Sequence, residues 1–179
     1  MNFILTMWLF PVALAVHIGE EFFGLAKWYQ KNFKEVPPSS SVSIPVFLVF
    51  GWVVTTLTTA WLTFLGDSHL AAWIILLLAT PILWNAAEHI TQTIIFHQYI
   101  PAVITSVIFL VPTISYLFYQ AYSARLVPVW YVAVLLVVVC VGTIHVVVAG
   151  KNNLTFEVLP FHKIGLYLAG KLGLDINAE

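Results

Sequence analysis

The sequence predicts an all-α membrane protein, a five-transmembrane-helix bundle that forms a single transmembrane domain over residues 1–179. The composition supports this fold class, because 61% of the residues are hydrophobic, only 8% are charged, and the mean hydropathy is +0.96. Soluble domains carry about 25% charged residues, so a soluble fold is excluded. The chain also contains five apolar runs, and each approaches or exceeds the length of about 20 residues that a helix needs to cross a bilayer.

Short segments that contain proline or glycine separate the apolar runs. Pro37 and Pro38 break the chain after the first run, Gly66 follows the second, and Pro101 and Pro128 precede the fourth and the fifth. Proline and glycine are the strongest local signals for such breaks. The predicted spans cover about residues 2–26, 42–65, 69–97, 102–122 and 129–149.

The tail of residues 151–179 has a different pattern from the spans. It mixes apolar side chains such as Phe161 and Leu166 with Lys163 and Lys171. A helix that lies in the membrane interface shows this combination of apolar and basic side chains. We therefore expect the tail to form a short interfacial helix.

The basic residues are distributed unequally between the two sides of the predicted bundle. Arg125 falls in the loop between the fourth and fifth spans, and the other six lie on the opposite side. Cytoplasmic loops carry the excess of lysine and arginine, so the N-terminus is expected outside and the C-terminus in the cytoplasm. The six cations on the cytoplasmic side are Lys27, Lys31, Lys34, Lys151, Lys163 and Lys171.

The first span carries three polar side chains in an otherwise apolar run, His17, Glu20 and Glu21. Residues three and four positions apart lie on one face of a helix, so both carboxylates share the face of His17. An ionisable side chain in the middle of a membrane costs about 2.5 to 3.5 kcal/mol on insertion scales and is read as functional by default.

Two further spans contribute similar side chains. Asn85, Glu88 and His89 repeat the three- and four-residue spacing in the third span, and His145 lies near the end of the fifth. The first, third and fifth spans run in the same direction, so all of these residues fall in the cytoplasmic half of the bilayer at about 1.5 Å per residue. We expect them to meet in one pocket.

The carboxylates and imidazoles expected in this pocket predict a divalent metal site. Like charges and desolvation oppose the ionisation of three carboxylates together, and a metal ion would neutralise them. Mixed imidazole and carboxylate ligands suit zinc or iron, with zinc favoured, and one ion or two could bind. As catalytic groups we expect Glu20 or Glu21 as the general base, with Asn85 orienting or hydrogen-bonding. The expected metal ligands are His17, Glu20, Glu21, Glu88, His89 and His145.

Three short motifs resemble those of the HXXEE family of integral membrane proteins. They are His17-Ile18-Gly19-Glu20-Glu21, the Asn-x-x-x-His element from Asn85 to His89, and Tyr99-Ile100-Pro101-Ala102, which is similar to the family's Tyr-x-Pro-Gly element. Ala102 stands where the family usually has glycine. The resemblance implies functional roles for His17, Glu20, Glu21, Asn85 and His89, but no particular reaction.

The leading hypothesis is a metal-dependent membrane hydrolase that acts on a lipid or another apolar substrate in the cytoplasmic leaflet of a bacterial inner membrane. One alternative is a di-iron lipid hydroxylase or desaturase, and another is a small proton- or cation-coupled transporter. A non-catalytic protein that uses the polar cluster only to hold its helices together also stays open. No nucleic-acid partner is expected, whereas a homodimer is compatible with the sequence.

Overall fold

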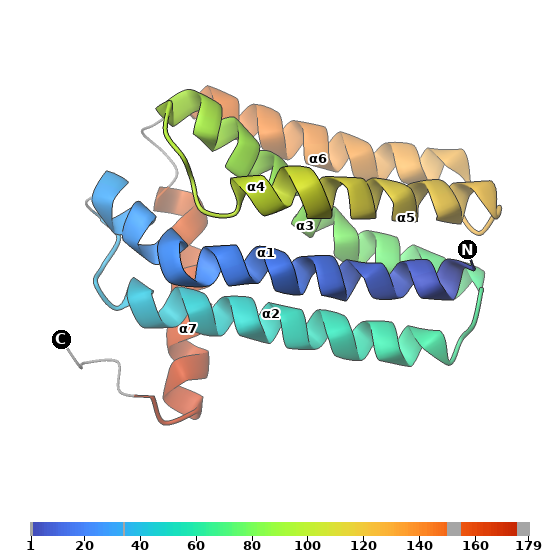
Figure 1. Cartoon of the computed structure of the whole chain (residues 1–179), viewed down its shortest axis with the longest axis horizontal. Coiled ribbons are helices and arrows are strands. Elements are labelled where there is room, and N and C mark those ends of the chain that lie inside the picture. The colour runs from blue at the N-terminus through green and yellow to red at the C-terminus, as the bar shows by residue number, and fades with distance from the viewer. Residues whose placement is uncertain (1, 34, 150–154, 175–179) are drawn as a thin grey trace.

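The computed structural model describes residues 2–33, 35–149 and 155–174, and this part of the chain is helical apart from short connections. Asn2 begins the first helix, because its side-chain oxygen accepts a hydrogen bond from the backbone N–H of Leu5. In chain order the elements are α1 (Phe3–Asn32), α2 (Ser40–Thr63), α3 (His69–Phe96), α4 (Val103–Thr105), the π-helical turn η1 (Ser106–Leu110), α5 (Val111–Ser123), α6 (Val129–Ala149) and α7 (Thr155–Lys171) (Figure 1).

Five helical segments are long and apolar enough to cross a membrane, which confirms the prediction of an all-α bundle at this level. Four of them are α1, α2, α3 and α6, and the other is the continuous segment of α4, η1 and α5. Neighbouring segments run in alternating directions (Figure 1). α1 differs from expectation, because it continues to Asn32, whereas the first apolar run ends at about residue 26.

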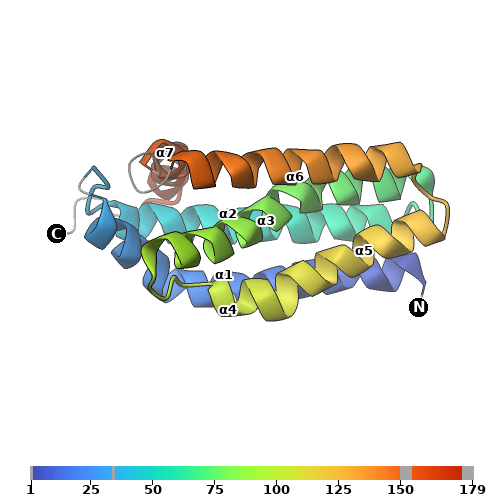
Figure 2. The ribbon, with the colours of Figure 1, turned by 90° about the horizontal axis from the view of Figure 1, so that it is seen from above.

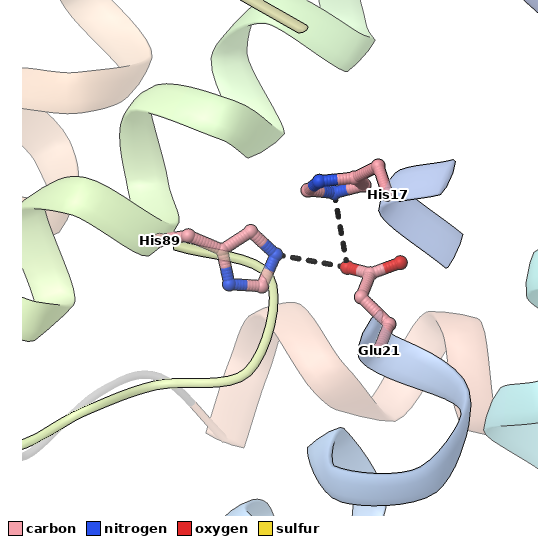
Figure 3. A group of neighbouring side chains, drawn as sticks. All are labelled: His17, Glu21 and His89. Carbon is pink, nitrogen blue, oxygen red and sulfur yellow. Dashed lines mark hydrogen bonds and ion pairs between the residues drawn. The ribbon is translucent and has the colours of Figure 1, made fainter. Parts of the chain in front are cut away.

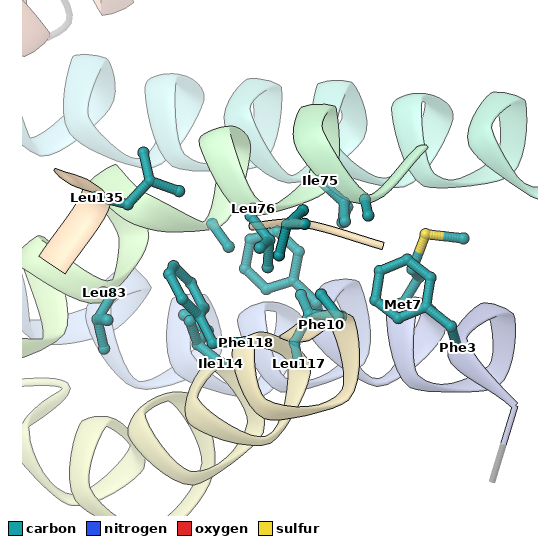
Figure 4. Close-up of a cluster of buried hydrophobic side chains, with 14 of the residues drawn as sticks. Phe3, Met7, Phe10, Ile75, Leu76, Leu83, Ile114, Leu117, Phe118 and Leu135 are labelled. Atoms are coloured by element: carbon teal, nitrogen blue, oxygen red, sulfur yellow. The ribbon is translucent and has the colours of Figure 1, made fainter. Parts of the chain in front are cut away.

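The apolar core lies between α1, α3, α5 and α6 (Figure 4). Met7 and Phe10 of α1, Leu76 of α3 and Leu117 of α5 are all fully buried in it. The buried residues of each helix recur every three or four positions, which places them on its inner face. Inside a membrane such a core is held by close packing more than by exclusion of water.

A return loop, residues 97–102, connects α3 to α4 and runs back toward the middle of the bundle (Figure 1). His97 ends α3 in the left-handed conformation with φ 52°, and Ala102 precedes α4 with φ 79°. The loop packs against α1 at Gly24, where a Cβ atom would lie 2.7 Å from Cγ of Pro101. As a result α4 starts beside the middle of α1.

The left-handed conformation of Ala102 explains why the Tyr-x-Pro-Gly element has glycine at this position. Glycine adopts a positive φ without the steric cost that a Cβ atom brings. The alanine leaves the turn intact and makes it slightly strained.

α7 crosses α2 at the end of the bundle where α1 terminates (Figures 1 and 2). The two helices approach closely, because a Cβ atom on Gly165 would lie 2.0 Å from the carbonyl oxygen of Ser43. The hydroxyl of Ser43 is also 2.6 Å from Nδ1 of His162. Of the six cations used to predict the orientation, Lys34 and Lys151 lie outside the described residues.

Candidate metal centre

Three side chains from two helices converge in the polar part of the bundle (Figure 3). His17 and Glu21 lie one turn apart on α1, and His89 faces them from α3. Oε1 of Glu21 is 2.8 Å from Nε2 of His89 and 3.4 Å from Nε2 of His17. One ligand atom from each residue lies within 4.8 Å of the other two. All three side chains are buried, with 1–2% of their surface exposed.

Asn85 links the two imidazoles. It lies one turn before His89 on α3, with Oδ1 at 3.1 Å from Nε2 of His17 and Nδ2 at 3.3 Å from Nε2 of His89. The two rings meet edge to face with their centroids 5.4 Å apart. The two motifs on α1 and α3 therefore form one site.

A second layer of contacts fixes the ring of His17. Oγ1 of Thr105, at the end of α4, is 3.1 Å from Nδ1 of His17 and 2.6 Å from Oε2 of Glu20. An ionised carboxylate only accepts hydrogen bonds, so the hydroxyl proton points to Glu20. The hydroxyl oxygen must then accept the bond from His17, and this places a proton on Nδ1 of the ring.

This proton position constrains what can occupy the centre. Nε2 of His17 then faces two oxygens, Oδ1 of Asn85 and Oε1 of Glu21. With the Asn85 amide oriented in this way, these two contacts are favourable only if Nε2 of His17 binds a cation or carries a second ring proton. Turning the Asn85 amide over would remove only the first of these contacts, because Oε1 of Glu21 would still lie 3.4 Å from Nε2 of His17.

The donor set fits a divalent metal. No lysine or arginine among the described residues pairs with Glu21, so its buried carboxylate relies on the two imidazoles for positive charge. Two imidazole nitrogens and one carboxylate oxygen form a known set of catalytic zinc ligands, with a fourth position left for water or substrate. Thr105 holds the other ring nitrogen of His17, as the outer partners of ligating histidines do.

Glu20 has a different role from its neighbour Glu21. One of its oxygens accepts bonds from the hydroxyl and the backbone N–H of Thr105, the latter at 2.9 Å, and the other accepts a bond from the hydroxyl of Tyr99. Glu20 therefore ties the return loop and α4 to α1 instead of joining the three-residue group. Burial and the nearby Glu20 carboxylate raise the pKa of Tyr99 to about 12, so the phenol stays protonated at physiological pH.

Two other expected ligands lie outside the group. An oxygen of Glu88 is 2.5 Å from Nε2 of Gln92, one turn further along α3. His145 is exposed on α6, which packs against α3 on the side of the bundle away from α1 (Figure 2). Its depth along the helix is compatible with the site, but its helix does not face the cluster.

Thr105 and Tyr99 were not expected as parts of the site. Neither residue carries a charge, and threonine in an apolar run usually serves interhelical packing. The one available signal for Tyr99 was its motif, which now has a physical meaning. All three motifs meet at α1, because the first contacts both Asn85-to-His89 and the return loop.

Comparison with known proteins identifies a family and a relative from Bacillus subtilis. The family described as "Protein of unknown function with HXXEE motif" matches residues 8–117. The chain is also similar to a protein of Bacillus subtilis (strain 168) named "Uncharacterized protein YrkK", with 25% identity over 122 residues, which cover 68% of this chain and 77% of the relative. No solved structure matches the chain.

Proposed function

The chain belongs to the HXXEE family, and from this premise we propose that it is a membrane-embedded, metal-dependent hydrolase that acts on a lipid or another apolar substrate. The observation that carries the proposal is the convergence of His17, Glu21 and His89 in a buried group. A zinc ion held there would act as a Lewis acid and activate water for attack on an ester or related bond.

The geometry favours one metal ion over two. A di-iron centre needs several bridging and terminal carboxylates. Here Glu21 is the one carboxylate in the group, because Glu20 binds Thr105 and Tyr99, and Glu88 contacts Gln92. Two histidines and one carboxylate also suit a single iron ion. Bound zinc would therefore indicate hydrolysis, and bound iron would indicate an oxidation reaction.

The site residues divide into three roles in this proposal. His17, Glu21 and His89 would hold the ion, and Asn85, in contact with both imidazoles, would orient water or substrate beside it. Glu20 would position His17 through Thr105. Glu21 is then the carboxylate closest to the reacting groups. Glu21 would therefore also act as the general base.

The proposed arrangement in the membrane follows from the positions of the charges. Lys27 and Lys31 lie near the end of α1, and Lys163 and Lys171 belong to α7, which crosses that end of the bundle. Arg125 lies at the other end. We propose a cytoplasmic C-terminus, an external N-terminus, an interfacial α7 and a bacterial inner membrane.

Substrate access requires movement, because the three proposed ligands are almost completely buried. The return loop is the segment to move. It is attached through the exposed Tyr99 and bounded by two residues with positive φ, His97 and Ala102. Segments that carry backbone strain are often found at ligand clamps and switches.

The direct test combines metal content with turnover. Purified full-length protein, reconstituted in phospholipid vesicles, should contain close to one zinc ion per chain and cleave members of a panel of ester, amide and phosphodiester lipids. Glu21→Gln and His89→Ala should lose both properties, with activity reduced at least about 100-fold. Glu88→Gln is the matched control and should keep them. Folded, active protein that is consistently free of metal would contradict the proposal. One iron ion per chain in place of zinc would contradict the hydrolase and favour an oxidative enzyme.

A second candidate, proton- or cation-coupled transport, has one observation in its favour. Hydrogen bonds run without a break from His17 through Thr105 and Glu20 to Tyr99, which is 55% exposed. Chains of ionisable and hydroxyl groups of this kind relay protons in membrane proteins. Proton flux into vesicles that Glu20→Gln abolishes would support transport, and flux unchanged by that variant would exclude this route.

A further inference from the structure

A cavity of about 570 Å³ lies at the end of the bundle opposite α7, where α3 and α6 begin and α5 ends. It is separate from the metal centre and does not depend on the function proposed above. Its polar lining includes Arg125, His69 and Tyr122, its apolar lining includes Val127 and Val129, and none of its lining residues is acidic. A volume of this size is within the range of small-molecule sites.

Arg125 occupies a backbone position that normally belongs to glycine. Its φ is 58°, and the N–H of Leu126 donates to the carbonyl of Ala121 at 2.9 Å, a bond that closes the end of α5. Helices that end with this bond usually place glycine in the left-handed position. An arginine there carries a conformational cost, and observed strain of this kind points toward a functional constraint.

His69 is held beside this turn. Its Nδ1 is 2.8 Å from the carbonyl oxygen of Leu126, so Nδ1 carries a proton and donates it. The ring is thereby fixed in the cavity wall next to Arg125. A guanidinium together with an imidazole and a phenol hydroxyl suits the oxygens of a phosphate group.

The surroundings of the cavity point to a phosphate that belongs to a lipid. Trp130 is exposed beside Val129 and packs edge to face on Trp73 with ring centroids 5.5 Å apart, as aromatic residues at the headgroup level of a membrane do. From Trp130 an exposed apolar stripe continues along α6 through Val134, Val137 and Val141. Acyl chains would lie along this stripe, whereas free phosphate has no apolar part that could pack against it.

We propose that this cavity binds the phosphate headgroup of a membrane phospholipid through Arg125, His69 and Tyr122, with the acyl chains along α6. The site recognises the phosphate diester and its apolar tail together. It is therefore a lipid site at the face of the bundle remote from the metal centre.

Native mass spectrometry of the full chain in mild detergent tests the proposal. The protein is titrated with phosphatidylglycerol, with a diacylglycerol of the same acyl chains that lacks the phosphate, and with inorganic phosphate. We expect one phosphatidylglycerol to bind at least about tenfold more tightly than diacylglycerol, and Arg125→Gln to remove most of this preference. Lys31→Gln, which removes an exposed cation at the other end of the bundle, should leave it unchanged.

A further variant guards against a simple folding defect. Arg125→Gly places the preferred residue at a positive φ, so it should unfold at the same or a higher temperature and still lose the phosphatidylglycerol preference. Equal binding of the two lipids, an equal loss in Lys31→Gln, or an Arg125→Gly protein that keeps the preference would each overturn the proposal. Inorganic phosphate bound as tightly as phosphatidylglycerol would also overturn it, because the ligand would then be the free anion.

Discussion

The first half of α1 packs Met7 and Phe10 against α3 and α5, whereas its second half directs His17 and Glu21 at His89 across the interface between α1 and α3. In the apolar half, the contacts depend on side-chain volume and on the face of the helix. In the polar half, they depend on which atom donates and which accepts. The apolar half of α1 should therefore accept substitutions by side chains of similar shape, whereas the polar half should accept few substitutions.

The largest effect on stability is expected in the apolar half. Phe10 is fully buried, so Phe10→Ala leaves a cavity and should lower the free energy of unfolding by about 3 kcal/mol, the lower end of the range for such truncations. Thermal unfolding in detergent measures this loss. The folded fraction should keep its metal, because no ligand contacts change, and loss of metal from folded Phe10→Ala would break the distinction between the two halves.

The next largest effect tests the polar half without touching a proposed ligand. Thr105→Val keeps the shape of the side chain but leaves Nδ1 of His17 without its acceptor. It also removes one of the donors to Glu20, whose bonds from the backbone N–H of residue 105 and from the hydroxyl of Tyr99 remain. Loss of such an outer partner typically reduces metal affinity by about 10- to 100-fold. Competition with a chelator measures the affinity, and Thr105→Ser is the control that should retain it. Equal affinity in the valine and serine variants would remove Thr105 from the site.

The sequence predicts the two halves with different success. Long apolar runs dictate helices that cross a membrane, and the four-residue spacing of His17 and Glu21 places them on one face. The three-residue group could therefore be expected as part of a larger set. Spacing within one helix cannot distinguish Glu20 from Glu21, because each lies about one turn from His17. The division between them depends on Thr105 and Tyr99, whose positions are set by the return loop.

His145 and Glu88 illustrate the same limit. Depth along a helix can be read from the sequence, but one histidine in an apolar run, such as His145 in α6, does not show toward which neighbour the helix turns that side chain. Glu88 is adjacent to His89, and adjacent residues on a helix point in different directions. Positive φ at His97 and Ala102 leaves no trace in the apolar pattern, although the glycine of the resembling motif was a signal for Ala102.

A smaller effect is expected at the return loop. Ala102→Gly relieves the cost of φ 79° and should raise the free energy of unfolding by about 1 kcal/mol or less, since glycine also gains freedom in the unfolded chain. Thermal unfolding is the measurement, and Ala86→Gly in the middle of α3 is the contrasting control that should destabilise the protein. A destabilised Ala102→Gly variant would contradict the observed turn.

The smallest effect concerns the contact of Tyr99 with Glu20. The pKa of Tyr99 is raised to about 12 from its ordinary value of 10, so this hydrogen bond contributes fully below pH 10 and is lost as the pH rises through about 12. An ultraviolet titration of the protein, which has seven tyrosines, should show a late phase whose amplitude Tyr99→Phe reduces. A pKa of Tyr99 at the ordinary value of 10 would show that the loop is not held by Glu20.

X-ray absorption at the zinc edge of zinc-loaded protein tests the central claim most directly. Two imidazole nitrogens at about 2.0–2.1 Å and a carboxylate oxygen at about 2.0–2.2 Å are expected around a single ion, and His17→Ala and His89→Ala should each remove one imidazole from the spectrum. A folded protein that binds no ion, or an ion whose imidazole ligands are unchanged by both substitutions, would contradict a metal centre at His17, Glu21 and His89.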